Sequence, residues 1–165
     1  MTLICVSGFI VNSHIASFWV AANEQQHNLL DEIHLTFPAL SAGTTLIVDG
    51  QCRYHGPATV FESNWDLEGA LKLLYQDNTI RANIITPDID INDDGIRIIG
   101  SGVQNYAFEN LFIYNHKEKK AYPIKNAKDA RQYFEMINPN YKVNCKDGRP
   151  GFGEPIYKIK SFVVR

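Results

Sequence analysis

The first 23 residues of the chain contain no Asp, Glu, Lys or Arg, and this run constrains the fold more than any other segment. It is rich in aliphatic and aromatic side chains, and its length is near the lower limit for a helix that crosses a bilayer. Asn12 and His14 make it more polar than most membrane helices. One interpretation is therefore that residues 1–22 are the end of a membrane helix, with Trp19 as an interfacial anchor.

The alternative interpretation is a soluble domain, in which residues 2–6 form a buried first strand and residues 11–36 form a helix. Both interpretations predict the helix, because its apolar residues recur at near-helical spacing and Pro38 follows it. These apolar positions are 11, 15, 18, 22, 29, 30 and 33. Under either interpretation, residues 1–36 form a long apolar to amphipathic helical segment.

The charges that follow the apolar run bear on the side of the membrane. Glu24, Asp31 and Glu32 come first, and the first basic residue of the chain is Arg53. Cytoplasmic flanks of membrane helices are usually enriched in Lys and Arg. The membrane interpretation therefore predicts that the rest of the chain lies on the extracytoplasmic side, whereas the soluble interpretation predicts a cytoplasmic protein.

Length and composition are typical of one globular domain, so residues 1–165 are expected to form a single domain. Residues 1–115 hold 4 basic and 13 acidic residues, and residues 116–165 hold 12 basic and 5 acidic residues. The basic residues of the tail are spread out rather than clustered, which favours packing against the acidic front over binding nucleic acid. No nucleic-acid partner is predicted.

The remaining pattern predicts an α/β domain with a small mixed sheet, two β-hairpins and helices packed on its faces. The hairpins are expected around the turn 92–95 and around residues 116–120. Asn64 is the expected N-cap of the second helix. The expected strands are 43–48, 82–86, 89–91, 95–99, 111–115, 121–124 and 157–164, and the expected helices are 65–76 and 127–137.

Reactive and aromatic residues are concentrated directly after the strand 43–48. In open α/β sheets, ligands bind beyond the carboxyl ends of the strands. The block therefore predicts a ligand-binding loop over residues 49–66. Its candidate ligand-binding residues are Asp49, Cys52, Tyr54, His55, Glu62 and Trp65.

The same block admits other chemistry. Cys52 and His55 have the spacing of two metal ligands or of a nucleophile and its base, but a zinc site needs three or four protein ligands and no second Cys/His pair is present. Asp49 and Glu62 with Asp66 form a candidate acid–base set. A small soluble enzyme using Asp49, Cys52, His55 and Glu62 stays open as an alternative. No catalytic residue, metal site or cofactor is assigned.

Two further patterns are weaker. Residues 90–95 match the first half of an EF-hand loop, but position twelve is Ser101 instead of Glu and the flanks are strand-like, so a hairpin is expected. Cys52 and Cys145 can form a disulfide in an extracytoplasmic domain, whereas cytosolic cysteines stay reduced.

Two motifs carry a resemblance to a known family. The order Trp19, Gln25-Gln26, Leu29-Leu30, Pro38, Gly43-Thr44-Thr45 and Val48-Asp49-Gly50 resembles the junction after the last membrane helix of polytopic bacterial membrane proteins of the glycosyltransferase-C type. The run from Tyr54 to Glu62, with Trp65 to Leu71, is similar to a block in uncharacterised members of that group. The resemblance covers residues 10–115.

This resemblance implies an extracytoplasmic α/β domain related to a membrane glycosyltransferase. Because the catalytic carboxylates of that superfamily lie in loops near early membrane helices, none is carried over to this chain. The expected function is non-catalytic binding of a glycan, a lipid-linked sugar or a neighbouring protein at the loop 49–66. A structural module that forms a homodimer through the helix 11–36 is the third alternative.

Overall fold

The computed structural model describes residues 2–85, 88–99 and 102–137, and within them the chain forms a mixed α/β domain. The predicted strand at 157–164 lies outside these residues. The elements are α1 (Thr2–Thr36), β1 (Thr45–Asp49), β2 (Tyr54–His55), β3 (Ala58–Thr59), α2 (Asn64–Tyr75), β4 (Arg81–Ile84), β5 (Asp88–Asn92), β6 (Gly95–Ile99), β7 (Val103–Ala107), β8 (Leu111–Asn115), β9 (Lys120–Ile124) and α3 (Ala127–Ile137).

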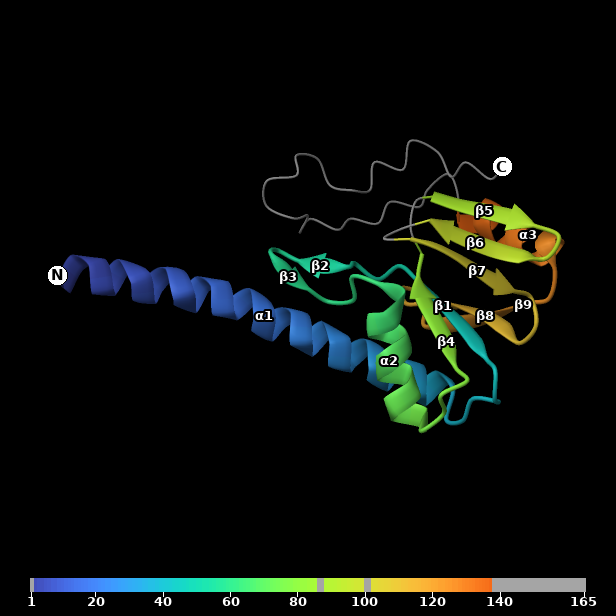
Figure 1. Ribbon diagram of the computed structural model, residues 1–165, viewed down its shortest axis with the longest axis horizontal. Helices are drawn as coiled ribbons and strands as arrows, with labels where there is room; N and C mark the ends of the chain where they lie inside the picture. Colours follow the sequence, from blue (N-terminus) through green and yellow to red (C-terminus); the bar gives the residue numbers. More distant parts are fainter. Residues whose placement is uncertain (1, 86–87, 100–101, 138–165) are drawn as a thin grey trace.

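Helix α1 is continuous over 35 residues, and its two halves have different surroundings. The first half extends away from the rest of the molecule (Figure 1), and its apolar side chains are exposed, with Phe9 at 74%. In the second half, Ala22, Leu29 and Ile33 are buried in the core. The alternative prediction of a strand at residues 2–6 is wrong: that segment is helical, and a helix closes its backbone hydrogen bonds without a neighbouring strand.

Strand β1 lies inside a four-stranded sheet of order β4-β1-β8-β9. It runs parallel to both β4 and β8, and β9 pairs with β8 in the antiparallel direction. All five residues of β1 are buried, as expected for a strand covered on both faces. Successive side chains point to opposite faces, so Leu46 and Val48 join one core cluster and Ile47 joins the other.

These two clusters give the domain three layers (Figure 1). On one face of the sheet, α1 and α2 contribute Leu29, Ile33, Leu67 and Leu71. On the other face, α3 packs together with a three-stranded antiparallel sheet of order β5-β6-β7. The predicted α/β fold with a mixed sheet, hairpins and helices on its faces is therefore confirmed.

Most element positions agree with the sequence prediction, and the differences are local. Helix α3 and the hairpins β5–β6 and β8–β9 lie where they were predicted. The short β2–β3 hairpin and β7 were missed, because two-residue strands and the mixed pattern VQNYA give little periodic signal. The N-cap of α2 is Ser63 rather than Asn64, and the Asp66 carboxylate accepts hydrogen bonds from the backbone N–H groups of Glu62 and Ser63.

Candidate functional site

A cleft of about 460 Å³ lies between the second half of α1 and the carboxyl end of β1. Its walls carry mainly amide and carboxylate side chains, together with one imidazole and one leucine. This α1–β1 cleft is lined by Gln25, Asn28, Asp31, Glu32, Leu35, Gly50, Gln51, Cys52 and His116. Such groups can donate and accept several hydrogen bonds to a polar ligand at once.

The topology of the sheet explains why the cleft lies here. After β1 the chain passes through β2, β3 and α2 to reach β4 on one side, whereas after β8 it turns to β9 on the other side. The connections therefore diverge at the carboxyl ends of β1 and β8, which is where open α/β sheets bind ligands. Gly50 has a φ of +85°, a conformation that favours glycine, and it turns the chain directly after β1.

One wall of the cleft is an ionic contact between α1 and the β8–β9 turn. His116 Nδ1 lies 2.9 Å from Glu32 Oε2, and Lys119 Nζ lies 3.0 Å from Glu32 Oε1. Burial raises the pKa of the Glu32 carboxyl, but the hydrogen bond from Lys119 and the positive charges of His116 and Lys119 outweigh it, so the pKa is lowered. Glu32 is therefore held as a carboxylate with the His116 imidazole at one oxygen and the Lys119 ammonium group at the other.

Asp49, a predicted ligand-binding residue, is fully buried beneath the cleft at the end of β1. The Tyr133 hydroxyl of α3 donates a hydrogen bond of 2.5 Å to Asp49 Oδ2. Asn115 at the end of β8 donates from Nδ2 to the same hydroxyl oxygen over 3.1 Å. This network ties β1, β8 and α3 together and fixes the floor on which Gly50 and Gln51 lie.

Cys52 and His55 have different positions relative to the cleft. Cys52 lines it and is disulfide-bonded, whereas Cys5 is an exposed free thiol. The predicted partner, Cys145, lies outside the described residues. A disulfide-bonded sulfur is not available as a thiolate nucleophile, which removes Cys52 from the alternative enzyme site. His55 does not line the cleft, but its Nδ1 lies 2.8 Å from Nε2 of Gln25, which does.

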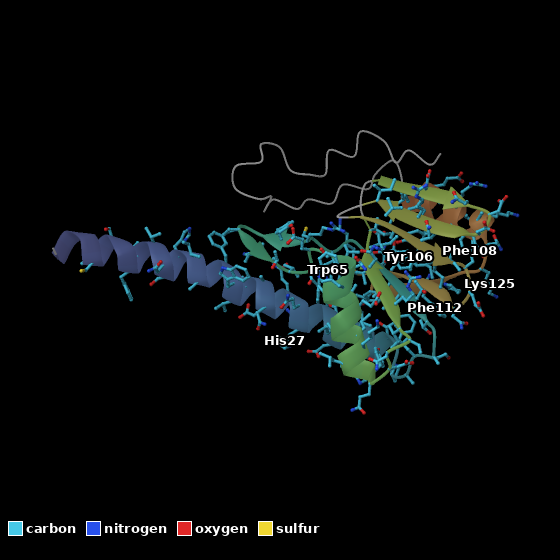
Figure 2. The ribbon with its side chains drawn as sticks, in the orientation of Figure 1. His27, Trp65, Tyr106, Phe108, Phe112 and Lys125 are labelled. Carbon is cyan, nitrogen blue, oxygen red and sulfur yellow. The ribbon has the colours of Figure 1, made fainter. Side chains whose placement is uncertain are left out.

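Tyr54, Glu62 and Trp65 are not brought into the cleft. Tyr54 is buried in the β2–β3 hairpin, and Glu62 is half-buried before α2. Trp65 is 64% exposed and lies at the start of α2 (Figure 2). The predicted loop 49–66 is therefore divided among the cleft, the hairpin that packs on α1 and the outer surface.

Sequence reasoning missed the contribution of α1 to the cleft. Gln25, Asn28, Glu32 and Leu35 follow one another at spacings of three or four residues, which places them on one face of the helix. That spacing is visible in the sequence, but a polar helix face is usually exposed to solvent. His116 is also a residue of the cleft, and only the β1–β8 pairing brings it close to residue 50.

The described residues contain no group of three or more His, Cys, Asp or Glu side chains that could hold a metal ion. Residues 90–95 lie in the β5–β6 hairpin as predicted: Asp93 and Asp94 form its turn, and the residues on either side are paired strand residues. Comparisons of the chain with family models, curated proteins and solved structures gave no match.

Proposed function

We propose that this chain is a membrane-anchored extracytoplasmic domain that binds a glycan or a lipid-linked sugar in the α1–β1 cleft without catalysing a reaction on it. One observation carries the proposal: a single continuous helix supplies both an exposed apolar segment and a wall of the polar cleft. The cleft is thereby held close to any bilayer that receives the first half of α1.

The first half of α1 has the properties of a membrane anchor. It is the one helix of the described chain that is long and apolar enough to cross a membrane. The β2–β3 hairpin contacts α1 at Phe18, where a Cβ on Gly56 would lie 2.5 Å from the ring. The part of α1 before Phe18, from Thr2 to Ser17, has 16 residues, just below the about 17–25 residues that a spanning helix needs, so a span must extend past Phe18. Inside it, the Ser17 hydroxyl donates to the His14 carbonyl over 2.7 Å, so this polar group is satisfied within the helix.

Three features support the extracytoplasmic side. The first basic residue after the apolar segment is Arg53, and Glu24, Asp31 and Glu32 precede it, which is opposite to the usual charge of a cytoplasmic flank. Cys52 is disulfide-bonded, and structural disulfides persist mainly outside the cytoplasm. The resemblance to extracytoplasmic domains of the glycosyltransferase-C type supports the same placement.

The position of the cleft suits a ligand attached to a lipid. Trp19 is 52% exposed and is the residue that we place at the membrane interface. Because an α-helix rises 1.5 Å per residue, Gln25 and Leu35 then lie ~9 and ~24 Å from Trp19 along α1. The cleft then begins near the headgroup region. Its amide and carboxylate groups match the hydroxyl groups of a sugar, which both donate and accept hydrogen bonds.

Membrane topology is tested first. Leu73 of α2 is 82% exposed, so Leu73→Cys in a Cys5→Ser background gives an accessible thiol. A membrane-impermeant maleimide should label it in intact cells without permeabilisation. Labelling only after permeabilisation would place the domain in the cytoplasm. A chain that stays out of membranes and sediments as a dimer would favour the homodimer through α1.

Ligand binding is tested with the full chain in nanodiscs that contain polyprenyl-phosphate-linked glucose, mannose or N-acetylglucosamine. Asn28→Ala removes a cleft amide, and Asn23→Ala is the matched control because Asn23 is exposed on the same helix but does not line the cleft. Asn28→Ala should weaken binding of the recognised sugar about tenfold, as expected for one lost hydrogen bond. Equal binding by both variants, or no binding of any of these sugars by the wild type, would contradict glycan binding in the cleft.

A further inference from the structure

A second cavity, of about 350 Å³, lies where the start of β4 meets the β6–β7 hairpin. It shares no residue with the α1–β1 cleft. Its polar lining consists of two arginines, two asparagines, one aspartate and the edge of a tyrosine: Arg81, Arg97, Asn92, Asn105, Asp94 and Tyr106. Figure 2 shows Tyr106 in the sheet region, well away from the free end of α1.

The two arginines are unusual in this part of the chain. Residues 1–115 hold only 4 basic residues against 13 acidic ones, and two of the four line this one cavity. Arginines in an acidic domain are expected to pair with carboxylates. Within the described residues, however, no ion pair joins Arg81 or Arg97 to any Asp or Glu. Among the described residues, neither guanidinium forms an ion pair, although Asp94 lines the same cavity and Asp90 lies opposite Arg97.

Arg81 is held in position by two contacts that leave most of its donors unused. Its Cζ lies 4.7 Å from the centroid of the buried Tyr106 ring, in a cation–π arrangement. Its Nη1 donates to the Asn105 carbonyl oxygen over 3.1 Å. A guanidinium has five N–H donors, so the planar group is oriented while several donors stay open to a ligand.

Arg97 lies on β6 directly opposite Asn105 of β7 and Asp90 of β5. Its Nε atom is buried and has no hydrogen-bond partner among the described residues. A buried donor left unpaired destabilises the folded state. Because Arg97 lines the cavity, an oxygen of a ligand bound there can accept from this donor.

We propose that this cavity binds a compact oxyanion, a phosphate or a carboxylate group of a small molecule, between the guanidinium groups of Arg81 and Arg97. Guanidinium groups bind such oxygens in a bidentate geometry, and the Asn105 and Asn92 amides can donate beside them. With the two arginines and the Asp94 carboxylate, the lining carries a net charge of +1, which suits one anionic group better than an extended polyanion. This arginine site does not depend on the glycan proposal, and either can fail without the other.

The test measures anion binding by the full chain in detergent micelles at constant ionic strength. Equilibrium dialysis with radiolabelled inorganic phosphate, and separately with acetate, should show saturable binding of one anion per chain. Arg97→Gln should weaken anion binding at least tenfold. Arg97→Lys should weaken it less than Arg97→Gln but should not reach the wild-type affinity, because a lysine cannot bind an oxyanion in the bidentate geometry of a guanidinium. Lys72→Gln is the matched control: it removes one positive charge from the same domain, but Lys72 is paired with Glu68 on α2.

Saturable binding of phosphate alone identifies a phosphate site, and binding of acetate as well identifies a general oxyanion site that includes carboxylates. Binding that is absent for both anions, or that falls equally in Arg97→Gln and Lys72→Gln, would overturn the proposal. Circular dichroism of each variant establishes that it is folded. If Arg97→Gln is unfolded, the comparison of Arg97→Lys with Lys72→Gln decides the same question.

Discussion

Glu32 of α1 and His116 of the β8–β9 turn meet across the α1–β1 cleft, with Nδ1 of the imidazole 2.9 Å from Oε2 of the carboxylate. The two residues are 84 positions apart in the chain, and Lys119 completes the contact on the second carboxylate oxygen. The contact joins the helix that carries the apolar segment to the carboxyl end of β8. It therefore links α1 to the sheet at the edge of the candidate site.

This contact predicts a dependence of stability on pH. The pKa of Glu32 is lowered from its ordinary value of 4.5, so the folded state favours the carboxylate. The stabilisation is complete above pH 4.5 and is lost as the pH falls below 4.5 through the folded-state pKa. Glu32→Gln should lower the free energy of unfolding by about 1 kcal/mol at pH 7, a modest value because the pair is partly solvated. The difference from wild type should shrink at pH 3.

Urea unfolding of the full chain in micelles, followed by Trp fluorescence at both pH values, measures this difference. Glu24→Gln is the matched control, because Glu24 is exposed on the same helix. An equal effect of the two substitutions at pH 7 would show that the contact with His116 and Lys119 adds no stability.

Gly95→Ala is expected to destabilise the domain by roughly 2 kcal/mol, because the added Cβ is forced against backbone. A Cβ at Gly95 would lie 2.1 Å from the carbonyl oxygen of Tyr106 on the neighbouring strand. Gly69→Ala is the contrasting change, since a Cβ there meets nothing within 4 Å and the site is inside α2. It should stabilise the domain by up to about 1 kcal/mol. Thermal unfolding that ranks the two variants in the opposite order would contradict the β6–β7 pairing.

Tyr133→Phe should cost about 2 kcal/mol, because it removes the hydroxyl that lies between the buried Asp49 carboxylate and the Asn115 amide. Tyr122→Phe makes the same chemical change on β9, where the hydroxyl donates to the exposed Glu118 carboxylate. That variant should stay within about 0.5 kcal/mol of wild type. Denaturant unfolding of both variants measures the difference, and a similar small effect at both positions would mean that the Asp49 network adds little.

The disulfide of Cys52 should contribute about 2–4 kcal/mol of stability, mainly by restricting the unfolded chain. Reduction should therefore lower the thermal midpoint of the wild type. Cys5→Ser should leave it unchanged, because Cys5 is a free, exposed thiol. Peptide mapping under non-reducing conditions tests the predicted pairing with Cys145. A wild type whose three cysteines all alkylate without reductant would contradict the disulfide.

Much of the fold could be predicted from the sequence because its signals are local. The turn at residues 92–95 marks the β5–β6 hairpin, and the apolar spacing with Pro38 marks the end of α1. The β2–β3 hairpin could not be predicted, because its strands have two residues each and it depends on packing against α1 at Phe18.

The candidate site was less predictable than the fold. Asp49, Cys52 and His55 were predicted to bind a ligand because they follow the expected strand 43–48. The end of that strand does border the cleft. The structure places Asp49 below the surface and brings Asn28 and Glu32 from α1 to the opening instead. No local pattern distinguishes a polar helix face that lines a cleft from one that faces solvent.

By itself, the sequence determined the α/β class, the long N-terminal helix and the charge-free segment within it, because helix periodicity, turn residues and charge are properties of neighbours in the chain. Only the tertiary structure decided that residues 2–6 continue the helix, that Glu32 meets His116 and that Arg81 meets Arg97 at one cavity. These outcomes depend on strand order and on packing between distant segments. The parallel pairing of β1 with β8 brings residues 50 and 116 together, and no local pattern encodes that pairing.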